Sequence, residues 1–169
     1  MEVTLENGRK ITIPDALVAP FLPKRTGYER VEHGGAYLYA TMLGNVTVDT
    51  EVGHCVDTER FDAANYYTDK QLALDNSRAD TLMRRLRRYA AEHGGIPSVN
   101  ERADVEVPKY SIFYRHDIRA LCVSNWRFME DAGWASFISQ AACEAAIAEF
   151  HDDLIWYFTA YEGQVRENE

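Results

Sequence analysis

Residues 65–95, NYYTDKQLALDNSRADTLMRRLRRYAAEHGG, decide the fold because the spacing of apolar residues changes within them. Before this stretch apolar residues tend to alternate with polar ones, as in strands, whereas within it they recur every three or four residues, as on one helix face. Asp69 has a side chain that caps helices, and Gly94-Gly95 are residues that stop them. The stretch therefore predicts a helix from Asp69 to His93, with an apolar stripe made of Leu72, Ala79, Leu82, Met83, Leu86, Tyr89 and Ala90.

Three hairpins are predicted from apolar, β-branched and aromatic residues that flank turn sequences. The first runs over residues 3–13 with Asn7-Gly8 at its turn, since this dipeptide tolerates the positive φ angles of a tight hairpin. The second runs over residues 36–52, and the third, rich in aromatic and β-branched residues, over residues 109–126. Each hairpin would need a cover for its apolar face.

The remaining segments carry weaker signals. Residues 15–21 predict a short helix confined by prolines, and residues 53–64 are predicted to be a loose connection. Residues 96–108 are polar and contain two prolines, which predicts an exposed linker. A second helix is predicted after the third hairpin; it stops near His151 and restarts through residues 154–161.

The two halves share a plan of hairpin, aromatic strand, capping residue and helix. Residues 65–69 and residues 135–139 hold equivalent places in the two halves, and Ser139 caps the second helix as Asp69 caps the first. The predicted fold class is α+β, with small antiparallel sheets that are each covered by a helix. The predicted parts of one compact domain are an N-terminal hairpin and short helix (1–27) and two pseudo-repeated ββ(β)α units (28–95 and 109–162).

Composition excludes several classes of protein. The 169 residues are 46 % hydrophobic and 12 % aromatic, which supplies one sizeable core and argues against disorder. No apolar run approaches the roughly 18 residues of a membrane span, and the start lacks the pattern of a signal peptide. The three cysteines form no C-x-x-C pair, which favours a reducing cytoplasm.

Motifs for catalysis, metal binding and phosphate binding are missing from the sequence. Histidines and cysteines lack the spacing of metal ligands, and no glycine-rich phosphate loop is present. Cys55, Cys122 and Cys143 are predicted to be inert thiols. Asp49 and Glu51 would share one strand face, where they are predicted to be solvated. We therefore expect no catalytic residue, no metal and no cofactor.

Negative charge is concentrated toward the end of the sequence. The chain has 27 acidic and 18 basic residues, and residues 139–169 carry seven acidic residues and one basic residue. Such a surface repels nucleic-acid phosphates, so direct binding of duplex DNA is not expected. It could occupy a basic groove in place of nucleic acid, or it could simply be solvated. The candidate partner-binding residues are Glu144, Glu149, Asp152, Asp153 and Trp156.

The dense basic cluster of the chain lies near the end of the first predicted long helix. Arg84 and Arg88 are four residues apart and share a helix face, with Arg85 beside them. Guanidinium groups match phosphate oxygens, so these three residues are candidates for phosphate binding. They could equally pair with acidic groups of the other half, or interact with the C-terminal end of the helix dipole.

A wider pattern joins these segments: a Tyr-rich hairpin, an Asn-aromatic-aromatic phrase, a helix with basic residues and Tyr near its end, a Lys-Tyr strand and a Ser-capped closing helix. The residues that carry it are Asn65, Tyr66, Tyr67, Ala73, Leu86, Arg88, Tyr89, Ala90, Lys109, Tyr110, Tyr114, Phe137, Ser139, Ala142 and Ile147. With them, residues 35–161 resemble a loose group of small uncharacterised proteins of tailed phages and prophages. The chain departs from the group at Gln140-Ala141, where an acidic pair is usual. The resemblance brings no catalytic residues and implies a mobile-element gene expressed in a bacterial cytoplasm.

These observations favour a small non-enzymatic binding protein that inhibits a host antiviral system, such as a CRISPR–Cas effector. The expected partner is a host defence protein or ribonucleoprotein with a basic groove. One alternative is a protein that sequesters a nucleotide signal with Arg84, Arg85 and Arg88, and another is a phage accessory protein in replication or assembly. A homodimer is a further expectation, because small α+β lobes often leave a sheet edge that can pair.

Overall fold

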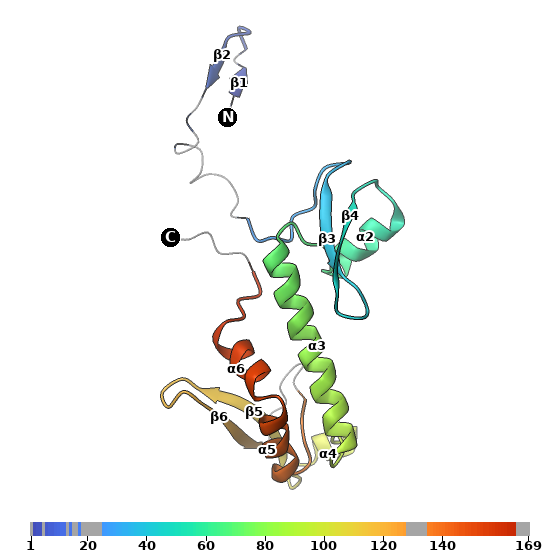
Figure 1. Cartoon of the computed structure of the whole chain (residues 1–169), viewed down its shortest axis with the longest axis vertical. Helices are drawn as coiled ribbons and strands as arrows, with labels where there is room; N and C mark the ends of the chain where they lie inside the picture. The colour runs from blue at the N-terminus through green and yellow to red at the C-terminus, as the bar shows by residue number, and fades with distance from the viewer. Residues whose placement is uncertain are drawn as a thin grey trace.

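The computed structural model describes residues 2–4, 6–12, 14, 17, 25–127 and 135–164, and it confirms the α+β class (Figure 1). In this part of the chain there are three antiparallel hairpins and five helices. The hairpins are β1 (Glu2–Thr4) with β2 (Lys10–Thr12), β3 (Ala36–Ala40) with β4 (Val46–Thr50), and β5 (Lys109–Arg115) with β6 (Ala120–Trp126). The helices are α2 (Cys55–Asp62), α3 (Lys70–Glu92), α4 (Val99–Ala103), α5 (Gln140–Glu149) and α6 (His151–Thr159).

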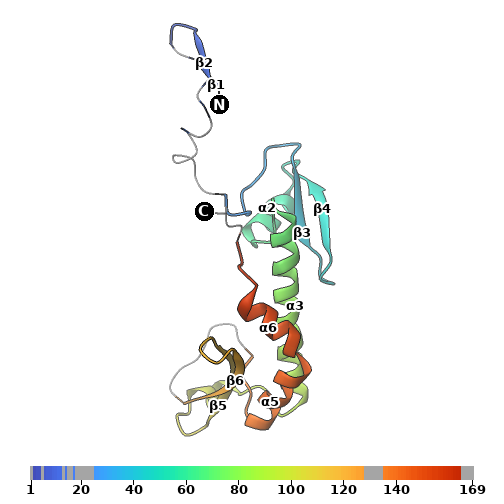
Figure 2. The ribbon, with the colours of Figure 1, turned by 60° about the vertical axis from the view of Figure 1, so that its left-hand side comes forward.

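Helix α3 is shared by both sheet-helix units. The first half of α3 packs against β3 and β4, and its second half packs against α5 and α6, so one unit lies at each end of the helix (Figures 1 and 2). The Asp69 carboxylate caps the helix by accepting the N–H of Leu72 at 2.8 Å. Gly94 and Gly95 follow with φ angles of 124° and 94°, which few other residues adopt. The predicted helix from Asp69 to His93 is confirmed.

The two units differ in their apolar cores. The larger core lies in the second unit and is built from α3, β5, the segment around Phe137, α5 and α6; its buried members are Leu82, Leu86, Ala90, Ile112, Ala135, Phe137, Ala142, Cys143, Ala146, Phe150 and Leu154. The first unit has a small buried cluster, which consists of Tyr67, Leu72 and Ala73. Apolar burial therefore stabilises the second unit more than the first.

The same local architecture occurs twice, as the equivalent sequence phrases predict. Tyr67 bridges to Leu38 of β3, and Phe137 bridges to Tyr110 of β5; each bridge has two main-chain hydrogen bonds of 2.8 Å. Two residues after each bridge comes the side chain that caps the helix. The third and fourth residues after each cap are buried: they are Leu72 and Ala73 in the first unit, and Ala142 and Cys143 in the second. The hairpins β3–β4 and β5–β6 thus each gain a third strand position and a covering helix.

Asn76 of α3 joins the segment before β3 to the segment after α6; we call the part of the structure between these segments, residues 28–163, the body. The Asn76 side-chain amide donates to the Tyr28 hydroxyl at 2.6 Å, and its carbonyl oxygen accepts the Tyr161 hydroxyl at 2.7 Å. The Tyr28 hydroxyl in turn donates to the main-chain oxygen of Gly163 at 3.1 Å. Asn76 is itself buried, and both its amide nitrogen and its carbonyl oxygen have a partner in these contacts.

A loose connection was predicted at residues 53–64 and an exposed linker at residues 96–108; both contain a helix that was not predicted, and the second segment is otherwise largely exposed as expected. Residues 53–64 hold α2, which has no apolar stripe, because its one buried residue is Asp57. Residues 96–108 hold α4, which begins with a capping box between Ser98 and Glu101. In both cases polar capping contacts favour the helix, and apolar periodicity does not reveal such contacts.

Other predicted elements are found close to their expected places. The second helix is divided at Phe150 into α5 and α6, as predicted, and the turn at Gly8 has a positive φ of 77°. The hairpin β1–β2 lies apart from both units in the two views (Figures 1 and 2). The short helix predicted at residues 15–21 lies largely outside the described residues. No helix in the described part has the length and apolar character needed to cross a bilayer.

Replacing Leu86 with Ala tests the shared core of α3. Leu86 is 0 % exposed, so the truncation leaves a cavity and should lower the free energy of unfolding by about 2–5 kcal/mol. Leu74 lies on the same helix at 42 % exposure, and Leu74→Ala should change it by less than about 1 kcal/mol. Urea denaturation followed by circular dichroism measures both variants; equal effects would contradict the placement of α3.

Candidate functional site

The structure brings together two of the residues predicted for different sites. The Asp153 carboxylate accepts hydrogen bonds from the guanidinium groups of Arg78 at 2.8 Å and Arg85 at 3.1 Å, and these ion pairs link α6 to α3. The Arg78 guanidinium lies 4.0 Å from the centre of the Trp156 ring. Asp153 and Trp156 therefore take part in the contact between helices, and Arg85 makes the pairing with the other half that the sequence left open.

The three other acidic candidates are exposed on α5 and at the start of α6. Glu144 accepts a hydrogen bond from Gln140 at 2.8 Å, and an Asp152 oxygen lies 3.0 Å from the His151 ring. Within the described residues none of Glu144, Glu149 and Asp152 pairs with a lysine or arginine. These three carboxylates, which we call the acidic face, are available to a partner.

A cavity of about 370 Å³ lies between the end of α3 and the junction of α5 with α6. Arg85 and Arg88 line it, but Glu92 and Glu149 line it as well, and Arg85 is already paired with Asp153. The Arg88 side chain is 3.9 Å from Glu92. A bound phosphate would meet as much negative as positive charge, so this lining does not favour an anion. Arg84, which donates to Thr81 at 2.9 Å, lies outside this cavity.

The three cysteines lie in different environments. Cys143 is buried in the core of the second unit, and this burial raises the pKa of its thiol to about 12. Cys122 is half-buried in β6, and Cys55 is exposed at the start of α2. In the part of the chain that the structure describes, no group of three or more His, Cys, Asp or Glu side chains is placed to hold a metal ion.

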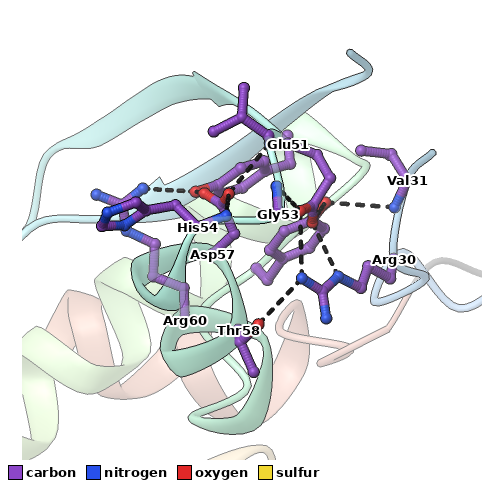
Figure 3. Close-up of polar contacts among 11 residues, drawn as sticks. Arg30, Val31, Glu51, Gly53, His54, Asp57, Thr58 and Arg60 are labelled. Atoms are coloured by element: carbon purple, nitrogen blue, oxygen red, sulfur yellow. Dashed lines mark hydrogen bonds and ion pairs between the residues drawn. The ribbon is translucent and has the colours of Figure 1, made fainter. Parts of the chain in front are cut away.

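Glu51 and Asp57 form the centre of a polar network in the first unit (Figure 3). The prediction of a solvated Glu51 is wrong, since Glu51 is 4 % exposed and Asp57 is 3 % exposed. Glu51 accepts hydrogen bonds from two nitrogens of the Arg30 guanidinium, at 2.8 and 3.2 Å, and from the Tyr66 hydroxyl at 3.1 Å. The main-chain N–H of Gly53 completes its contacts at 2.9 Å. Sequence reasoning missed these partners because Arg30 is far from Glu51 in the chain.

Asp57 accepts one side-chain and two main-chain donors. The Tyr37 hydroxyl donates to it at 2.8 Å, and the N–H groups of Val52 and His54 donate at 3.1 and 3.0 Å. The Tyr37 and Tyr66 rings are stacked, with centroids 3.9 Å apart and planes 10° from parallel. The two buried carboxylates therefore lie at the hydroxyl ends of one stacked aromatic pair.

Arg60 closes the network on the side of α2. Its guanidinium donates to the Tyr37 hydroxyl at 2.5 Å and to Asp49 at 2.6 Å, and it lies 3.6 Å from the Tyr39 ring centre. Asp49 was predicted to be solvated; it is about half exposed and ion-paired. The pairing takes place because Asp49 lies opposite Tyr37 in the hairpin register.

The contacts keep the carboxylates of the network ionised. The hydrogen bond from Arg30 lowers the pKa of Glu51, and the hydrogen bond from Tyr37 lowers the pKa of Asp57. Arg60 lowers the pKa of Asp49 in the same way. Among the described residues every buried side-chain nitrogen and oxygen has a hydrogen-bond partner, and this holds for the network as well. Its chemistry is that of a structural centre, which replaces a large apolar core.

Comparisons with known proteins give no further assignment. No family model, curated protein or solved structure matches this chain. The resemblance to phage and prophage proteins therefore stays a prediction from the residues quoted above. The acidic face and the polar network rest on the geometry alone.

Tyr37→Phe tests the network without changing the stacked rings. The change removes the hydroxyl that links Asp57 and Arg60, and it should lower the free energy of unfolding by about 1–3 kcal/mol. Tyr39 is on the same strand, and its hydroxyl makes no hydrogen bond within the described part of the chain. Tyr39→Phe should therefore change stability by less than about 0.5 kcal/mol. Equal effects in urea denaturation would show that the network hydroxyl adds nothing.

Acid should destabilise the first unit before the second. The pKa values of Glu51 and Asp57 are lower in the folded chain than in the unfolded chain, so their stabilisation is complete above about pH 4.5 and is lost as the pH falls. Glu29 behaves alike: burial raises its pKa, but donors from Thr26, from its own main-chain N–H and from Thr68 lower it to about 2.

Protection factors from hydrogen exchange between pH 6 and pH 2.5 would measure this difference unit by unit. We expect residues 36–62 to lose protection at higher pH than residues 140–159, whose core is apolar. Simultaneous loss in both units would contradict a separate role for the carboxylates.

Proposed function

We propose that this chain is a non-enzymatic binding protein that inhibits a host antiviral system, with a CRISPR–Cas effector as its concrete target. The observation that supports the proposal most is the acidic face. Glu144, Glu149 and Asp152 are exposed, close in sequence and without a lysine or arginine partner in the described structure, whereas the neighbouring Asp153 is paired with Arg78 and Arg85. The acidic face would occupy a basic, nucleic-acid-binding groove of the effector.

Electrostatics favour this mode of binding. An effector that holds nucleic acid has a groove lined with lysine and arginine, and carboxylates spaced along two helices can replace phosphates there. The net charge of −9 would accelerate the encounter with such a groove and would make it sensitive to salt. The same negative charge disfavours a different mechanism, in which this chain itself would bind nucleic acid.

The helices that carry the acidic face are held rigidly. Asp153 and Trp156 fix α6 on α3 through Arg78 and Arg85, and Phe150 and Leu154 are buried at the junction of α5 with α6. A fixed spacing of the carboxylates lowers the entropy that binding must overcome. Asp153 thus supports the face by positioning it, and should be kept intact when the face is tested.

Charge reversal of the acidic face tests the proposal in cells. In bacteria with an active CRISPR–Cas system, expression of the wild-type chain should raise plaquing of a targeted phage by about tenfold or more. The triple variant E144K/E149K/D152K should lose this effect, because a basic groove would repel three lysines. Plaque counts on strains with and without the system measure the result.

The matched control reverses three exposed acidic residues of the first unit. E32K/E59K/D62K changes the net charge from −9 to −3, as the other triple variant does, because each substitution adds two charges. This control should keep its effect on plaquing. Failure of the wild-type chain against a panel of effector types would remove the proposed target, and equal activity of both triple variants would remove the acidic face as the contact.

A further inference from the structure

Strand β4 leaves one edge of the first sheet unpaired. The opposite edge of this sheet is formed by β3, and it is paired with Tyr67, because the N–H and C=O of Leu38 both bond to that residue. Within the described structure nothing pairs with the outer edge of β4, and neither view shows a strand beside it (Figures 1 and 2). Unpaired strand edges of this kind are templates for another strand.

The hydrogen-bond register shows which main-chain groups point outward. The N–H of Glu51 bonds to the oxygen of Gly35, and that of Thr41 bonds to the oxygen of Asn45. In an antiparallel pair of strands, hydrogen-bonded and non-hydrogen-bonded residue pairs alternate. The main-chain N–H and C=O groups of the odd-numbered residues of β4 therefore point toward β3. The main-chain groups of Val46, Val48 and Thr50 therefore face the open edge. The N–H of Thr50 is already bonded to the Asp49 side chain at 2.8 Å.

The edge has few of the features that normally protect an exposed strand. Residues 46–50, VTVDT, contain no lysine and no proline, and their register with β3 has no bulge. The acidic residues beside the edge do not repel a second chain strongly, because Asp49 pairs with Arg60 and Glu51 pairs with Arg30. Val48 is 62 % exposed at the middle of the strand.

We propose that two copies of this chain associate through β4, antiparallel and about a two-fold axis at Val48. In this register Val46 of one copy bonds to Thr50 of the other, and the two Val48 residues bond to each other. Each copy would donate two main-chain hydrogen bonds, from Val46 and Val48. Asp49 would lie opposite Thr47 of the other copy, so no like charges face each other.

Exposed apolar residues at the two ends of β4 support this register. Met42 and Leu43 in the turn before β4 are 97 % and 87 % exposed, and Val52 after it is 56 % exposed. A two-fold axis at Val48 brings the turn of one copy beside Val52 of the other, because Gly44 and Val52 are equally distant from Val48 in sequence. A second copy therefore covers both apolar ends at once, and the association is independent of the proposed function.

Sedimentation of the full chain tests the association. An interface of one short strand is small, so we expect a weak dimer whose average mass rises from 19.3 kDa toward twice that value between about 10 and 500 μM. Val48→Pro removes an outward N–H that the hairpin itself does not use, so it should keep the fold and abolish the rise. Val48→Lys places two like charges at the axis and should also abolish it.

Thr47→Lys is the matched control, because it adds a charge to the same strand but places it opposite Asp49 of the other copy. This variant should associate at least as well as the wild-type chain, and circular dichroism verifies that all three variants are folded. A wild-type chain that stays at 19.3 kDa would overturn the proposal. So would V48P and V48K chains that are folded and associate like the wild type.

Discussion

Apolar side chains of α3 are buried against two separate units, and this burial positions the elements that pack on the helix, namely β3, β4, α5 and α6. The first half of the helix covers the β3–β4 hairpin, and the second half supplies Leu82, Leu86 and Ala90 to the core beneath α5 and α6. One continuous helix therefore sets the distance between the units, because an α-helix has a fixed rise per residue. The contact of Asp153 with Arg78 and Arg85 adds a second, electrostatic link along the same helix.

The two units have the same local architecture, but different interactions stabilise them. Each has a hairpin, a bridging aromatic residue and a capped helix, but the second unit has a large aliphatic and aromatic core, whereas the first unit buries Glu51, Asp57 and two tyrosine hydroxyls. A satisfied polar network fixes the positions of its members more narrowly than apolar packing does, because each bond has a required direction. The first unit thus depends on Arg30 and Arg60, which lie at its surface.

Sequence patterns predicted the parts of the fold that depend on local periodicity. The stripe of α3, the caps at Asp69 and Ser139, and the break near His151 all involve residues a few positions apart, and all are found. Helix α2 and the polar network were missed because their contacts are polar and join distant residues, such as Arg30 with Glu51.

The candidate site was predicted in part, for the same reason. Exposure of Glu144, Glu149 and Asp152 follows from their charge, whereas the pairing of Asp153 with Arg78 joins residues that lie far apart in the chain. No rule of spacing identifies such a pair. Only the packing of α6 on α3 determines which of four neighbouring carboxylates is neutralised.

Asn76 has a consequence for the connectivity of the chain. It binds Tyr28 and Tyr161, and Tyr28 binds Gly163, so the body begins and ends at the same place. The order of the two units along the polypeptide is therefore not imposed by the architecture. We expect a circularly permuted chain, with a short peptide joining residue 163 to residue 28 and new ends in the exposed stretch around Asp104, to keep α3 packed against both units.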